Sequence, residues 1–259
     1  MAKQKLTPEE KVFRMEKLLK MEKYQFLHNF VYWCGMIGIF VLGFFTADTY
    51  VPEVMGPAGG KASSLADIFN GMVYDSTFLL IIISGLLALS FGQEFSGRTI
   101  TLEVSAGHSR SKIFTGKIIS YLIAFHIMAL VYPAAGCIRE FGKFGMEDSG
   151  GFFYNVTKAI VYSLLLNSGI FLIAILICCY LQDVVRATSV TAIIIFALSL
   201  YLGYGMMLQL PVAFLPVYQI RVVVSRNTFF QPAAILAGVI WSGILILLSW
   251  IKFRKCDLK

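Results

Sequence analysis

Residues Ala159–Tyr180 read AIVYSLLLNSGIFLIAILICCY, a run that contains no Asp, Glu, Lys or Arg. A transmembrane helix needs about 20 predominantly apolar residues to cross a hydrocarbon core about 30 Å thick. The run is continuous rather than alternating, which favours a helix over a membrane β-strand of about ten residues. Its length and composition therefore predict a membrane-spanning α-helix.

The rest of the chain has the same character, since 58% of its residues are hydrophobic and only 14% are charged. Soluble domains are about 45–50% apolar and about 25% charged. Because lipid offers no partners to backbone polar groups, these values predict an all-α membrane domain over residues 30–251. Six spans are predicted: Phe30–Thr46, Ser76–Gly92, Ile118–Ile138, Ala159–Tyr180, Ala187–Leu208 and Ala233–Ile251.

Lysine and arginine are distributed unequally between the two sides of this arrangement. Segments 1–29, 93–117, 181–186 and 252–259 hold 16 of the 22 Lys and Arg residues. Cytoplasmic segments of membrane proteins carry an excess of these residues. We therefore expect both termini, including the tail 252–259, on the cytoplasmic side. The net charge of +7 then reflects topology and attraction to an anionic lipid bilayer, with no nucleic acid as a partner.

The first cytoplasmic segment, residues 1–29, predicts an amphipathic helix over Pro8–Leu27. Pro8 suits the first helical turn, and an apolar stripe at helical spacing is interrupted by Glu22. We expect an interfacial helix beneath the bilayer, with a solvated positive flank as the alternative. The side chains expected to reach lipid headgroups are Lys17, Lys20 and Lys23.

Two outer segments differ from each other in composition. The first, Ala47–Asp75, is rich in proline and glycine between Pro52 and Gly60, so we expect irregular structure. The last, residues 209–232, is largely apolar but is broken by three prolines. It predicts a pair of short re-entrant or interfacial helices, and a loop packed on headgroups is the alternative.

The sequence contains no recognisable active centre. Its three histidines, His28, His108 and His126, lie far apart, and its five cysteines show neither a metal nor a disulfide pattern. We expect no catalytic residue, no metal site, and no cofactor or nucleotide site in this chain. His126 lies at membrane depth and is a candidate polar site. A neutral imidazole that bonds a neighbouring helix is the simpler interpretation.

A polar insert, residues 93–117, separates the second and third spans and reads QEFSGRTITLEVSAGHSRSKIFTGK. It predicts a helix over Glu94–Glu103, a break at Gly107 and a second helix that Ser109 can cap. Such a hairpin can transmit a displacement to two spans at once. An ordinary positively charged loop is the alternative interpretation.

The order of residues in this insert resembles the coupling loop of ABC-2-type exporter permeases. The matching residues are Glu94-x-x-Gly97-x-Thr99-x-x-Leu102, then Gly107-x-Ser109-Arg110, and then Gly116-Lys117. Six spans, an N-terminal amphipathic helix and broken outer helices follow the same plan. Two departures are Arg98, which separates the usual Gly-Thr pair, and Gly107-His108, where many members place a proline.

The resemblance implies the permease subunit of a bacterial ABC exporter in the plasma membrane, moving a peptide, such as an antimicrobial peptide, or another amphipathic substrate. ATP and Mg²⁺ would bind a dimer of separate ATPase subunits, and a second permease chain, identical or paralogous, would complete the path. The insert would be the coupling hairpin docked on the ATPase, and the helix Pro8–Leu27 would approach the same subunit. The implied docking residues are Glu94, Arg98, Thr99, Glu103, Ser109 and Arg110.

Two other classes stay open from the residues alone. A non-transporting membrane sensor or scaffold could use the insert to bind a regulatory partner. An ion-coupled carrier needs a titratable group at membrane depth, and the predicted spans contain no carboxylate, so His126 would be its candidate.

Overall fold

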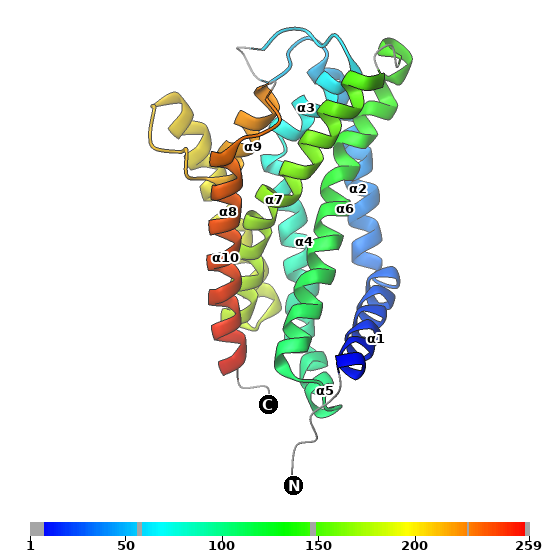
Figure 1. Cartoon of the computed structure of the whole chain (residues 1–259), viewed down its shortest axis with the longest axis vertical. Helices are drawn as coiled ribbons and strands as arrows, with labels where there is room; N and C mark the ends of the chain where they lie inside the picture. The colour runs from blue at the N-terminus through cyan, green and yellow to red at the C-terminus, as the bar shows by residue number, and fades with distance from the viewer. Residues whose placement is uncertain (1–7, 56–58, 146–148, 227, 257–259) are drawn as a thin grey trace.

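The computed structural model describes residues 8–55, 59–145, 149–226 and 228–256, and this part of the chain contains helices and no strand (Figure 1). Six of the helices are long and apolar enough to cross a membrane, which confirms a multi-pass all-α protein. In chain order the elements are α1 (Pro8–Leu27), α2 (Phe30–Thr46), η1 (Ala47–Tyr50), α3 (Leu65–Tyr74), α4 (Thr77–Ser96), α5 (Thr99–Ser105), α6 (Arg110–Phe144), α7 (Ser149–Leu181), α8 (Val184–Met207), α9 (Pro216–Ser225) and α10 (Pro232–Lys255).

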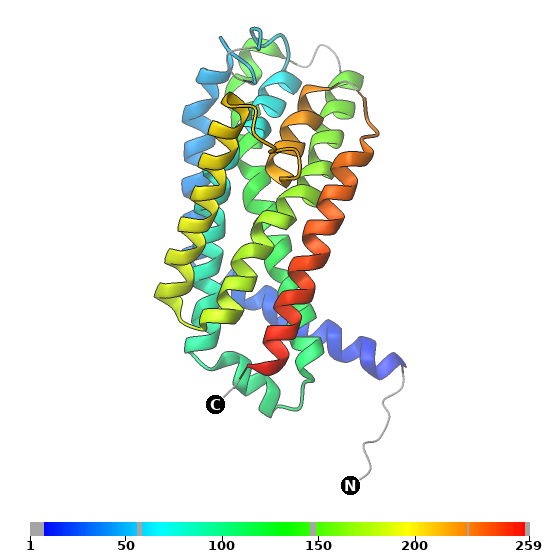
Figure 2. The same ribbon diagram turned by 90° about the vertical axis from the view of Figure 1, so that its left-hand side faces the viewer.

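The six long helices, α2, α4, α6, α7, α8 and α10, run up and down in one bundle (Figure 1). One end of the bundle carries α1, α5 and the last turn of α10, and we call it the hairpin end. The opposite end carries α3 and α9, and we call it the loop end. Figure 2 shows α1 lying across the direction of the long helices.

The helix boundaries agree with the predicted spans to different degrees. The bounds of α1 and α2 coincide with the predicted ones. By contrast, α6 and α7 extend beyond the predicted spans at both ends, to 35 and 33 residues. Hydropathy marks only the apolar part of a helix, whereas backbone hydrogen bonding continues through polar flanks.

The core of the bundle follows α7. In its most apolar stretch 67% of the residues are buried, compared with 22% in α2, α8 and α10. Phe171 of α7 stacks on Phe125 of α6 with ring centroids 4.8 Å apart, and Cys178 and Cys179 are fully buried. These two cysteines therefore act as small packing residues. The other helices turn large apolar side chains outward, as a lipid-facing surface requires.

Residues 65–74 at the loop end correct the prediction of irregular structure across Ala47–Asp75. Ser64 and Asp67 form a capping box, in which the Ser64 hydroxyl accepts from the Asp67 N–H and the Asp67 carboxylate accepts from the Ser64 N–H. Most of α3 is buried against α6, α7 and α9. The Ser-x-x-Asp signal before an apolar run outweighs the nearby glycines and prolines.

Residues 209–232 form one short helix, α9, where a pair was predicted. Pro216 occupies its first turn, and the residues before it form tight turns. Val217, Ile220 and Val224 are buried, and α9 packs against α7, α3 and α10. The segment is thus held by protein contacts on its inner face, which agrees with the expectation for broken backbone near a membrane.

Candidate functional site

The hairpin at the end of the bundle has two sharp breaks. The chain leaves α4 at Ser96, and Arg98 adopts a left-handed backbone with φ of +58°. The prediction of one helix over Glu94–Glu103 is therefore wrong, because Glu94 belongs to α4 and Glu103 to α5. The break predicted at Gly107 is confirmed by its φ of +88°. Ser109 precedes α6, although its side chain makes no capping hydrogen bond.

Four charged side chains meet behind this hairpin in a group that we call the Lys117 cluster. Lys117 of α6 is 1% exposed and pairs with three carboxylates. Its Nζ lies 2.7 Å from Oε1 of Glu22 and 2.9 Å from Oε1 of Glu103, and it also contacts Oε2 of Glu94. The Tyr121 hydroxyl donates a 2.5 Å hydrogen bond to Oε1 of Glu94. One buried ammonium thus joins α1, α4, α5 and α6.

Local structure explains why these side chains converge. Glu22 follows Leu18 by one helical turn on α1, and Leu18 is 2% exposed, so both residues lie on the face turned to α6. Gly116 allows this approach, since a Cβ there would overlap the Leu18 side chain. Lys117 and Tyr121 are likewise one turn apart on α6. The acid that interrupts the apolar stripe of α1 is therefore its ionic anchor.

Burial sets the electrostatics of the cluster. With every member ionised, three negative charges would face one positive charge in a site that water barely reaches. The pKa of Glu22 is raised to about 7, mainly by burial and also by the charge of Glu94, while Lys117 opposes both effects. Burial also raises the pKa of Glu103, which Lys117 only partly offsets. The cluster therefore favours a bound proton near neutral pH.

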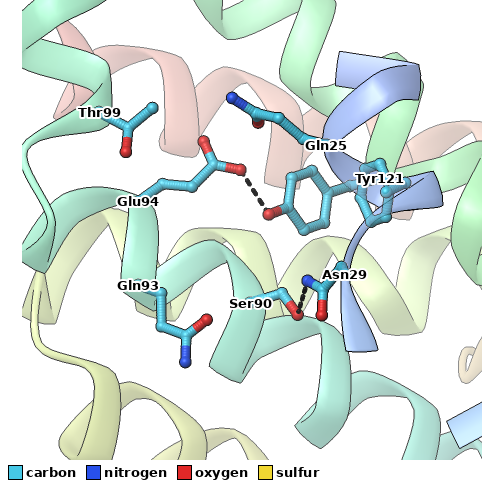
Figure 3. A pocket seen from close by; sticks show the side chains of 8 residues that line it. Gln25, Asn29, Ser90, Gln93, Glu94, Thr99 and Tyr121 are labelled. Atoms are coloured by element: carbon cyan, nitrogen blue, oxygen red, sulfur yellow. Dashed lines mark hydrogen bonds between the residues drawn. The ribbon is translucent and has the colours of Figure 1, made fainter. Parts of the chain in front are cut away.

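A small polar cavity gives water access to this cluster (Figure 3). Its volume is about 150 Å³, which is enough for several water molecules. Figure 3 shows the Glu94 carboxylate directed at the Tyr121 hydroxyl, with Gln25 and Thr99 on the same side. Asn29 caps α2 through its side-chain oxygen and donates to Oγ of Ser90 at 3.3 Å. The junction of α1 and α2 is thereby tied to α4.

The three carboxylates also have the spacing of acidic side chains that share a metal ion. Their nearest oxygens lie within 4.8 Å of one another. The Nζ of Lys117 already occupies the position that a cation would take, and its three donors match the three carboxylates. The geometry is that of an internal counter-ion, and it leaves no open coordination position for a metal.

The six predicted docking residues divide into three groups. Glu94 and Glu103 are buried and face Lys117. Arg110 donates from Nη1 to the backbone carbonyls of Arg254 at 2.7 Å and Cys256 at 3.0 Å, so it closes the end of α10. Thr99 is half-buried at the start of α5, and Arg98 and Ser109 are exposed.

The hairpin also exposes an apolar side chain that the docking set did not include. Leu102 of α5 is 66% exposed. It directly precedes Glu103, which is buried and contacts Lys117, so neighbouring residues of one short helix provide an external surface and an internal contact. An exposed leucine beside an exposed arginine, Arg98, has the composition of a protein-binding surface.

Sequence reasoning missed the roles of Glu22, Lys117 and Tyr121. Glu22 was noted only as a break in an apolar stripe, and Lys117 only as part of the Gly-Lys pair that ends the insert. The available signal was a lysine at the edge of an apolar run, because a charge there needs a partner from the same end of the bundle.

The remaining predicted positions are held as follows. His126 of α6 bonds Oγ of Ser168 on α7 at 2.8 Å, as the simpler interpretation expected. The Ser168 hydroxyl donates to the Leu164 carbonyl, so Nε2 of His126 is the donor to Oγ of Ser168. Lys17, Lys20 and Lys23 of α1 are exposed.

A larger cavity lies at the loop end between α2, α4, α6, α8 and α9, with a volume of about 880 Å³. Arg221 of α9 reaches into it and donates to the Tyr74 carbonyl at 3.2 Å and to Oγ1 of Thr77 at 3.3 Å. Burial raises the pKa of Asp75, and the nearby Arg221, 3.8 Å away, opposes the shift. Phe78 and Phe196 line the apolar remainder.

No protein family matches the chain. A search of curated proteins likewise finds no match.

Proposed function

We propose that this chain is the transmembrane permease subunit of an ATP-driven ABC exporter, which moves a peptide or another amphipathic substrate. ATP and Mg²⁺ would bind a separate ATPase dimer, and a second permease chain would complete the path. The observation that carries this proposal is the connection between α5 and the Lys117 cluster. A short exposed helix is joined by buried ion pairs to three helices that enter the bundle.

The proposed orientation places the hairpin end in the bacterial cytoplasm. The described parts of the basic segments, residues 8–29, 93–117 and 252–256, lie at this end, and the positive-inside rule assigns such segments to the cytoplasm. An ATPase subunit in the cytoplasm would then meet α5 and α1 on the same side of the bilayer.

The proposed mechanism is mechanical. The ATPase would contact Arg98, Leu102 and Ser109, which are exposed on the hairpin. A displacement of α5 would move Glu103, and the shared ammonium of Lys117 would carry that movement to α1, α4 and α6. The buried carboxylates Glu94 and Glu103 act here as positioning residues inside the hairpin, whereas the sequence suggested direct contacts.

The cavity at the loop end supports an amphipathic substrate. It combines Arg221, Asp75 and Thr77 with aromatic and aliphatic side chains in one space of about 880 Å³. This volume lies within the ~300–1,000 Å³ of typical ligand sites. The poorly buried faces of α2, α8 and α10 leave room for a second permease chain or for lipid.

Co-purification and ATP hydrolysis test the proposal. The tagged chain, extracted from host membranes, should retain an ATPase subunit whose hydrolysis in lipid changes when the chain is added. Replacing Arg98 and Leu102 together by Ala and Ser should abolish this coupling without affecting membrane insertion. Lys61→Ala, at an exposed site in the segment that leads to α3, is the matched control.

The outcome also separates the rival classes. An associated protein without ATPase activity would favour a sensor or scaffold and contradict the exporter. Transport driven by an ion gradient without ATP, and lost in His126→Ala, would favour a carrier.

A further inference from the structure

An apolar groove of about 360 Å³ lies between α1 and α6 at the hairpin end. Its walls come from α1, from Tyr32 of α2 and from one face of α6. Figure 2 shows α1 lying across the bundle. Its volume is at the lower end of the range for small-molecule sites, about 300–1,000 Å³.

The α6 wall of the groove is a straight apolar stripe. Ile119, Ile123 and Ile127 are spaced four residues apart, so they lie on one face of the helix. They are 39%, 55% and 45% exposed. Eight residues of helix advance by about 12 Å, so the stripe leads away from α1 along the bundle. This direction is the one that a lipid acyl chain takes in a bilayer.

The α1 wall supplies a cation at the end of that stripe. Lys23 lines the groove and is exposed, and among the described side chains no acid lies within ion-pair distance of it. The adjacent acid, Glu22, does not line the groove and pairs with Lys117. Lys20, one turn away, is also exposed on α1 but does not line the groove.

We infer that the α1–α6 groove binds one anionic phospholipid, with the phosphate at Lys23 and an acyl chain along Ile119, Ile123 and Ile127. A zwitterionic lipid fits the same apolar wall, but its headgroup carries no net charge to complement Lys23. The bound lipid contacts both α1 and α6, so it reinforces the position of α1. This site requires a bilayer and no ATPase partner, and is therefore independent of ATP-driven export.

Native mass spectrometry of the purified chain in a zwitterionic detergent tests this site. Phosphatidylglycerol and phosphatidylcholine with the same acyl chains are added at equal concentration, and the lipid retained per chain is measured. We expect one phosphatidylglycerol in preference to phosphatidylcholine. Lys23→Gln should weaken its retention about fivefold, the factor for one lysine at a membrane surface, whereas Lys20→Gln should change it less than twofold.

Substitutions in the apolar wall test the acyl-chain part of the site in the same mass-spectrometry experiment. Ile123→Ser should reduce the retention of both lipids, and Ile138→Ser, which is exposed on α6 outside the groove, should reduce neither. Thermal midpoints of all variants verify that they remain folded. Equal retention of the two lipids would mean ordinary surrounding lipid and would overturn the site. Equal losses in Lys20→Gln and Lys23→Gln, or displacement of the lipid by inorganic phosphate alone, would overturn it as well.

Discussion

Removing the ammonium at the centre of the Lys117 cluster should release α1 from the bundle. Lys117→Met keeps the length of the side chain but leaves three carboxylates facing one another in a buried site. Removing one partner of a buried ion pair costs about 3–5 kcal/mol. Glu22 can escape this cost because it lies on α1, which leaves the bundle more easily than α4 or α6. We therefore expect α1 to undock while the six long helices remain packed.

The magnitude of this effect defines the assay. A change of about 3–5 kcal/mol raises the open fraction of α1 by roughly 10²–10⁴-fold. Hydrogen exchange followed by mass spectrometry, in lipid nanodiscs, should show that loss of protection in residues 17–27. The amides of α7, which is the most buried long helix, should keep wild-type protection. Lys61→Met, on an exposed side chain outside the cluster, is the control.

A compensating variant separates the ion pairs from a general folding defect. Replacing Lys117 by Met together with Gln at Glu22 and Glu103 removes most of the buried charge, and such neutral replacements are often tolerated. Protection of α1 should then recover at least tenfold relative to Lys117→Met. Wild-type protection in Lys117→Met alone would refute the reasoning, because the ammonium would then not hold α1.

Three further outcomes follow from particular residues. Because burial raises the pKa of Glu22 to about 7, docked α1 binds a proton that the free helix releases. The free energy of α1 docking should therefore weaken by up to about 3 kcal/mol as the pH rises from about 4.5 to 7, and then level off. Hydrogen exchange corrected for intrinsic rates should show that Glu22→Gln flattens this dependence. The other titratable groups that face Glu22 or its partners are Glu94, Glu103, Lys117, Tyr121 and His108. Arg98→Gly should stabilise the hairpin by about 1 kcal/mol, because glycine adopts the φ of +58° at this position without strain, whereas Arg98→Ala should not. Equal melting temperatures of the Gly and Ala variants would contradict backbone strain at Arg98. Gly43→Ala should destabilise the α2–α6 packing by about 1–3 kcal/mol, since its Cβ would overlap the Tyr132 carbonyl, with Gly38→Ala, at an open position, as the control in thermal unfolding.

The membrane helices were predictable because their signal is local. A run such as Ala159–Tyr180 is apolar on every side, and its length alone matches a bilayer. Hydropathy and the distribution of charged residues do not predict the short helices. The helix α3 was therefore missed, although Ser64 and Asp67 form a capping box at its start. Local capping chemistry there was outweighed in the prediction by the glycines and prolines that precede it.

The site was only partly predictable because its geometry is not local. The insert was recognised as the important polar segment, but one continuous helix was assumed through Arg98, whose left-handed backbone changes the direction of the chain. That break turns Glu103 inward and Leu102 outward. Lys117 and Glu22 lie 95 residues apart, and no local pattern connects them.

The distance in sequence between these partners has a consequence for biosynthesis. The chain is made from its N-terminus, so Glu22 leaves the ribosome 95 residues before Lys117. At about 5–20 residues per second, this interval lasts roughly 5–20 seconds. During that time Glu22 lacks its partner Lys117, and two spans, α2 and α4, are synthesised before that partner exists. Docking of α1 through Glu22 therefore requires that the chain up to the start of α6 has already been made and inserted.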